Sequence, residues 1–310
     1  MAFAGLASRY KVRCNEWLEM ETNALVRDLV VAFNRRKPVR AGSLIITLYG
    51  DAIVPRGGSL SLGDITRIME LFRIDSGHVR TAISRLTTEK WLERKKVGRN
   101  TFYKLSKRGE GAFARATTRI YLARRAETAK LRLALLNGEA AHRAAQRKAL
   151  EAANFAPFNA MTYVSADAAP LKSIKGIHLL DLPASAEVIE ILRAAYKLDD
   201  LADRYREFIA QFRSLHDALK RGAALNDREA LTVRLLLIQE FRRAVLRDPA
   251  LPSALLPAGW PGEEARALAA SIYKKVLTAS ERQLDQCQAD ETHALPKPNI
   301  SLSQRFAAAQ

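Results

Sequence analysis

The chain has 310 residues, 48% of them hydrophobic and 27% charged, which indicates two or three globular domains and excludes an intrinsically disordered protein. Its 50 lysines and arginines outnumber 33 acidic residues, and the net charge of +17 favours a polyanionic partner: nucleic acid, an anionic membrane surface or a phosphorylated ligand. Two cysteines cannot form a disulfide framework, basic residues at 9–13 interrupt the apolar N-terminus, and no apolar run approaches the ~20 residues of a membrane span. We therefore expect a cytoplasmic protein that is neither secreted nor embedded in a membrane.

The positive charge is confined to one part of the chain. Residues 1–34 are neutral, residues 35–110 contain 17 basic and seven acidic residues, and residues 111–180 contain 11 basic and four acidic residues. Residues 181–310 are again neutral, with 18 of each sign. This segregation indicates a polyanion-binding module joined to a part with another role.

The first 115 residues predict two units. Apolar residues at helical spacing predict a helical extension over 1–34, and Pro38 separates it from a unit over 35–115. That unit is expected to contain helices at 44–53, 62–72 and 77–90, and strands at 91–97 and 101–105. Ser43 and Asp75 are the expected N-caps of its first and third helices. A further helix is expected from Ser106.

The rest of the chain predicts an α+β unit followed by a helical one. Residues 116–182 contain expected strands at 131–136, 158–164 and 176–182 and a basic helix at 139–153. Residues 183–288 are expected to be helical, and their apolar seam at 201–219 is typical of helix-on-helix packing, within one subunit or between two. The tail 289–310 has prolines and no periodicity, so we expect it to be disordered.

Three helices followed by a basic hairpin is the order of a winged helix-turn-helix. Polar residues of the third helix lie opposite its apolar face, where they can reach base edges and phosphates in a DNA major groove. The hairpin can touch the DNA backbone or the minor groove. The alternative, a merely solvated surface, is disfavoured by the helix order, the basic hairpin and the local charge. The candidate DNA-binding residues are His78, Arg80, Thr81, Ser84 and Arg85 on the helix and Lys95, Lys96, Arg99 and Asn100 on the hairpin.

Two blocks of sequence contain distinctive motifs. The first has GSLIITLYGD at 42–51, PRGG at 55–58 and VRTA at 79–82; the second has QEFRR at 239–243, RDP at 247–249 and WPG at 260–262. Together the two blocks resemble the PaaX family, repressors of bacterial phenylacetate catabolism. The resemblance implies a mostly α protein with α+β parts: an N-terminal winged helix-turn-helix, a middle ferredoxin-like module over 116–182 and a C-terminal helical domain. It also implies a double-stranded DNA operator and an aryl-acyl-coenzyme A effector, typically phenylacetyl-coenzyme A, with no effector-binding residues assigned.

The sequence carries no enzyme signature. It has no glycine-rich phosphate loop and no Gly-x-Ser-x-Gly elbow, and its five histidines lack metal-ligand spacing. The family's ferredoxin-like module also resembles a CRISPR-associated metal nuclease with an aspartate at the end of its first strand, where this chain has Asn137. An amide is a poor ligand for a hard metal compared with a carboxylate. We therefore expect no catalytic residues, no metal and no cofactor.

Three functions are compared: a sequence-specific transcriptional repressor, a nucleic-acid enzyme built on the middle module, and a non-specific architectural DNA binder. The missing carboxylate argues against the nucleic-acid enzyme. The neutral helical half argues against the architectural DNA binder, because positive charge alone would be enough for that function. We expect the repressor to be a homodimer, because two copies on a two-fold operator read a longer site. Like-charged surfaces repel, so the neutral C-terminal half is the expected dimer contact.

Overall fold

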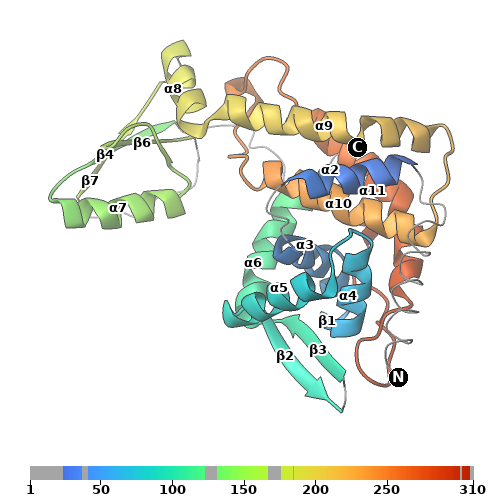
Figure 1. Cartoon of the computed structure of the whole chain (residues 1–310). Helices are drawn as coiled ribbons and strands as arrows, with labels where there is room; N and C mark the ends of the chain where they lie inside the picture. Colours follow the sequence, from blue (N-terminus) through green and yellow to red (C-terminus); the bar gives the residue numbers. More distant parts are fainter. Residues whose placement is uncertain are drawn as a thin grey trace.

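The computed structural model describes residues 24–36, 41–98, 100–122, 131–166, 176–183, 185–300 and 302–307. In this part the chain is mostly helical with two small antiparallel sheets, an α+β mixture as predicted. A large body holds the hairpin and most helices, and a smaller unit built on the second sheet lies beside it (Figure 1). Helix α9 (Leu198–Lys220) runs from the smaller unit across the body.

The expected DNA-binding unit has its helices and hairpin in the predicted order. Its elements are α3 (Ala41–Leu48), a π-helical turn (Tyr49–Ile53), β1 (Ser59–Ser61), α4 (Leu62–Glu70), α5 (Ser76–Thr88), β2 (Leu92–Val97) and β3 (Asn100–Leu105). Asp75 caps α5 as predicted, by accepting backbone N–H groups. The Ser43 cap is wrong, because α3 begins before Ser43, whose hydroxyl instead accepts from the side-chain amide of Gln239 at 3.0 Å.

The hairpin belongs to a three-stranded sheet in the order β1-β3-β2. Lys96 lies opposite Thr101 and Val97 opposite Asn100, so the connection is a tight turn at Gly98, whose positive φ of 54° suits glycine. The sequence did not predict β1, which is only three residues long and pairs with β3 from across α4 and α5.

The smaller unit has a four-stranded antiparallel sheet in the order β5-β6-β4-β7. Its elements are β4 (Arg132–Leu136), α7 (Ala140–Ala152), β5 (Ala156–Pro157), β6 (Thr162–Ser165) and β7 (Ile177–Asp181). The predicted strand 158–164 overlaps only β6, at residues 162–164, and β5 lies before it. Helix α8 (Ala186–Tyr196) packs on β5 and β6 and shares an apolar cluster with Val164 of β6, so by packing this unit extends past the expected boundary at residue 182.

The remaining α-helices also belong to the large body. They are α2 (Ala24–Arg35), α6 (Lys107–Thr117), α9, α10 (Asp227–Val245) and α11 (Gly262–Leu284). The residues of the 201–219 seam are buried against α10 and α11, so the seam packs within one subunit. Helix α2 packs on α9 and α10 instead of extending from the body, and residues 1–23 of the expected extension lie outside the described residues.

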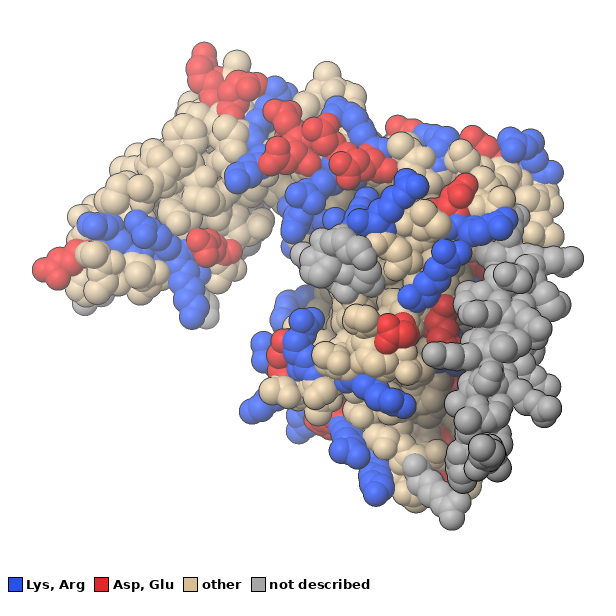
Figure 2. All heavy atoms as spheres, in the orientation of Figure 1, with Lys and Arg blue, Asp and Glu red and all other residues tan. Residues whose placement is uncertain are grey.

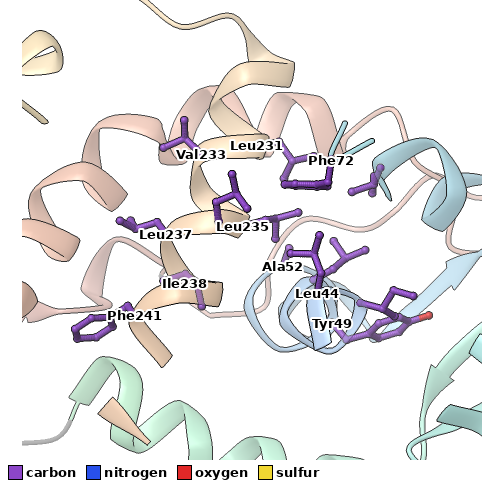
Figure 3. Packing of buried hydrophobic residues seen from close by; sticks show 14 of the residues in the cluster. Leu44, Tyr49, Ala52, Phe72, Leu231, Val233, Leu235, Leu237, Ile238 and Phe241 are labelled. Carbon is purple, nitrogen blue, oxygen red and sulfur yellow. The ribbon is translucent and has the colours of Figure 1, made fainter. Parts of the chain in front are cut away.

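One apolar core joins the expected DNA-binding unit to the helical half. It contains residues of α3, α4, α5 and the hairpin together with residues of α2, α9, α10 and α11. Figure 3 shows this junction, with Leu44, Tyr49, Ala52 and Phe72 on one side and Leu231, Leu235 and Ile238 of α10 on the other. The two units therefore form one packed body instead of two domains with separate cores.

The described part of the tail packs on the body, which corrects the prediction of disorder. Leu295, Leu302 and Phe306 are buried. The N–H of Phe306 donates to the carbonyl oxygen of Tyr121 at 3.2 Å. These buried apolar residues lie too far apart in the sequence to show the period of a helix or a strand. The prolines and polar residues between them therefore led to the prediction of disorder.

Candidate nucleic-acid interface

Helix α5 presents a polar face away from the core. Val79, Ala82, Ile83 and Leu86 are buried beneath it. All five predicted contact residues of the helix are exposed, and they share that outward face: His78, Arg80, Thr81, Ser84 and Arg85. The geometry therefore brings this part of the candidate site together.

The polar residues of α5 differ in how free their side chains are. His78 forms a hydrogen bond through Nδ1 with Asp75, whose pKa is lowered by the backbone N–H and the ring of His78. The hydroxyl of Thr81 donates back to the carbonyl oxygen of Gly77 at 3.0 Å. Arg80 extends from the middle of the helix and is the longest exposed donor of the face without an ion pair among the described residues.

Arg85 lies where α5 meets the start of α3. Its Nε is 3.6 Å from a carboxylate oxygen of Glu89, and its Nη2 packs so closely on Gly42 that a Cβ there would lie 3.2 Å from it. On the other side of α3, Arg242 donates to the hydroxyl of Ser43 at 3.1 Å. Two arginines thus flank the described start of α3.

The hairpin extends basic side chains beyond the body. Arg94, Lys95 and Lys96 are exposed on β2, and Asn100 is exposed at the start of β3. Figure 2 shows lysine and arginine side chains at the bottom of the body, where the hairpin lies in Figure 1. The predicted contact residue Arg99 lies outside the described residues. The described basic residues can neutralise phosphates on DNA that follows α5 to the hairpin.

A buried cluster of charges lies behind this surface, centred on Asp51 in the π-helical turn. Its carboxylate accepts from Arg234 of α10 at 2.5 Å and from Arg305 of the tail at 2.7 Å. The hydroxyls of Tyr121 and Tyr273 donate to it at 2.5 and 3.1 Å. Burial opposes ionisation of Asp51, but the two guanidinium groups outweigh burial and lower its pKa.

The buried cluster continues to Arg56, whose side chain is fully buried. Its Nε lies 2.9 Å from Glu281 of α11, and its Nη1 lies 2.9 Å from Asp285. Glu281 also accepts from Arg234 at 2.5 Å. Ion pairs therefore fix the turns that follow α3 to α10, α11 and the tail, in addition to the shared apolar core.

These buried charges were not predicted from the sequence, although part of the signal is present there. Asp51 is the one charged residue in the apolar run 44–54, and Arg234 is the one charged residue in the apolar run 230–238. A single charge inside an apolar helical run indicates a buried partner. Arg305 gave no such signal, since its surroundings in the sequence are mixed.

Other site types find little support in the described residues. They contain no group of three or more histidines, cysteines, aspartates and glutamates placed to hold a metal ion. Asn137, where the nuclease alternative needs a carboxylate, lies at the end of β4 with its amide 3.4 Å from His178. None of the described helices is both long and apolar enough to cross a membrane.

Two family models match the chain in the two blocks described above. The PaaX-like protein model matches residues 40–109, and the PaaX-like protein C-terminal domain model matches residues 196–286. The transcriptional repressor PaaX of Escherichia coli (strain K12) is 34% identical over 286 residues, covering 87% of this chain and 90% of that protein.

A solved structure is also similar: the uncharacterized protein Rv0674 from Mycobacterium tuberculosis, at 21% identity and a TM-score of 0.46 over 70% of this chain and 90% of that one. A similarity of this size does not define the fold.

Proposed function

This chain belongs to the PaaX family, and from that premise we propose that it is a transcriptional repressor that binds double-stranded DNA in the cytoplasm. The observation that carries the proposal is the exposed polar face of α5 beside a basic hairpin. A regulator of this kind needs no catalytic residues. The role of the neutral helical half is then to respond to a signal and to hold two copies together.

We propose that residues 41–105 act as a winged helix, with α5 in the major groove and the hairpin as the wing. Arg80 and Arg85 are the proposed base and phosphate contacts, because an arginine can bond a guanine edge through two donors. His78, Thr81 and Ser84 are proposed to complete the face. Lys95, Lys96, Arg99 and Asn100 are proposed to contact the DNA backbone or the minor groove.

The proposal extends to the middle unit, the assembly and the signal. The strand order β5-β6-β4-β7, with α7 after the first strand, supports a ferredoxin-like module with α8 on its sheet. We propose a homodimer held by the neutral C-terminal half, with contacts other than the 201–219 seam, which is already buried. Family membership further suggests a phenylacetate-type operon and release of the DNA by phenylacetyl-coenzyme A or a related thioester.

The test begins with DNA fragments that the protein selects from a genomic library. On a selected fragment, Arg80→Ala should weaken binding by about 1–3 kcal/mol and relax the preferred sequence, because a base contact is lost. Arg206→Ala removes an exposed arginine on α9 and serves as the control. Unchanged affinity and sequence preference in Arg80→Ala would remove α5 from base recognition. Coenzyme A thioesters added to the same complex identify the one that releases DNA.

A further inference from the structure

The C-terminal segment, described at 287–300 and 302–307, contacts the proposed DNA-binding unit at several points. Near its start, the N–H of Gln288 donates to Asp64 of α4 at 2.9 Å, and the carbonyl oxygen of Ala289 accepts from Ser59 of β1 at 2.9 Å. Further along, the N–H of Asn299 donates to the carbonyl oxygen of Pro55 at 2.7 Å. Its end is held by the ion pair between Arg305 and Asp51. The segment is therefore anchored at the base of the turn that it makes beside the wing, and again after that turn.

That turn, residues 287–295, has a fixed shape. The N–H of Leu295 donates to the carbonyl oxygen of Cys287 at 2.7 Å, and an isolated bridge pairs Gln288 with Ala294. At the tip, the Asp290 carboxylate accepts from the N–H groups of Thr292 and His293, both at 2.8 Å. Asp290 thus shapes the turn and leaves the next residue, Glu291, to point outward.

Glu291 reaches the turn of the hairpin. A Cβ placed on Gly98 would lie 3.1 Å from Oε2 and 3.2 Å from Cδ of Glu291, with Oε1 closer still. The glycine at this position leaves room for a carboxylate as well as allowing the positive φ. In Figure 1 the tail descends beside the free end of β2 and β3. A negative charge therefore lies at the tip of an otherwise basic hairpin. The glycine that it contacts is two residues from both Lys96 and Asn100.

We propose that Glu291 is an intramolecular competitor for DNA at the wing, an inference that rests on the proposed function. Its carboxylate occupies the position at the hairpin turn that a DNA phosphate would approach. A carboxylate and a phosphate at the same place repel each other, so binding of DNA at the hairpin turn requires the tip around Glu291 to withdraw. The anchors at Asp64 and Asp51 allow the tip to withdraw without release of the segment. The C-terminal segment thereby tunes the affinity of the wing.

The test compares two full-length variants that lose the same charge. Glu291→Gln removes the carboxylate beside the hairpin. Glu263→Gln removes an exposed carboxylate in the first turn of α11, whereas the C-terminal segment follows the last turn of that helix. Binding to a labelled random-sequence DNA duplex is measured at low and at high salt. Glu291→Gln should bind about two- to fivefold tighter than Glu263→Gln at low salt, a gain that shrinks as salt screens the charges. Equal or weaker binding by Glu291→Gln would refute the competition.

A measurement without DNA separates this inference from the proposed function. Amide hydrogen exchange at the hairpin turn should be faster in Glu291→Gln than in Glu263→Gln, because a neutral amide lacks the charge that attracts this side chain to the basic hairpin. If the wild type binds no duplex at low salt, the proposed function fails, whatever the exchange shows. If the wild type binds DNA and Arg80→Ala weakens it, but the two glutamate variants behave alike in both measurements, only the competition by Glu291 fails.

Discussion

Asp51 illustrates how one side chain can fix the position of a whole element. It sits in the π-helical turn after α3, which lets its carboxylate face Arg234 and Arg305. The turn also needs Gly50, because a Cβ there would collide with the ring of Phe113. Buried ion pairs are costly to break from one side, since the remaining charge is left without compensation. The connection between the proposed DNA-binding unit and the helical half therefore depends on this carboxylate.

Replacing Asp51 tests that dependence. Asp51→Asn keeps the shape but leaves two guanidinium groups short of a partner, so the free energy of unfolding at neutral pH should fall by about 3 kcal/mol. The pKa of Asp51 is lowered in the folded protein, so its contribution is complete above its unfolded pKa and is lost as the pH falls through the folded value. The free energies of unfolding of wild type and Asp51→Asn, measured with urea, should accordingly differ less below pH 4 than at neutral pH. Asp203→Asn, in an exposed ion pair, is the control and should change stability by less than about 0.5 kcal/mol.

At the scale of elements, local patterns predicted most of what was local. The period of α5, its Asp75 cap and the tight turn of the hairpin are all readable within a few residues, and the structure has them. The short strand β1, the anchoring of the tail and the approach of Glu291 to Gly98 depend on partners far along the chain. No periodicity encodes such contacts, so the candidate DNA face was predictable and the element that covers its wing was not.

The hairpin itself should control the salt dependence of DNA binding. Each phosphate contact removed lowers the slope of log K against log salt by about 0.9. Lys95→Ala combined with Lys96→Ala should therefore flatten the slope by about 1.8 if both contact phosphates. Lys274→Ala combined with Lys275→Ala removes the same charge from the exposed face of α11 and should leave the slope nearly unchanged. Parallel slopes for the two double variants would place the hairpin away from the DNA.

At the scale of the whole molecule, the division of charge does not coincide with a division of packing. The sequence separates a basic half from a neutral half, yet one core contains residues of α3 to α5 and of α9 to α11. Separate fragments of the two halves would expose this core. Helix α10 packs on α3 and α3 packs on α5, so the proposed signal to the helical half would reach α5 through packed elements.

Unfolding with two tryptophan probes tests whether the body is one cooperative unit. Trp91 lies beside the hairpin with Arg108 over its ring, and Trp260 packs against Tyr205 of α9. One variant keeps only Trp91 and another only Trp260, with the other tryptophans, including Trp17, changed to Phe. Both probes border the same core. In each variant, the fluorescence of the remaining tryptophan should therefore change at the same urea concentration as the circular dichroism signal of that variant. A Trp91 transition that precedes loss of helix would mean that the proposed DNA-binding unit opens by itself, and the route from α10 to α5 would then be too weak to transmit a signal.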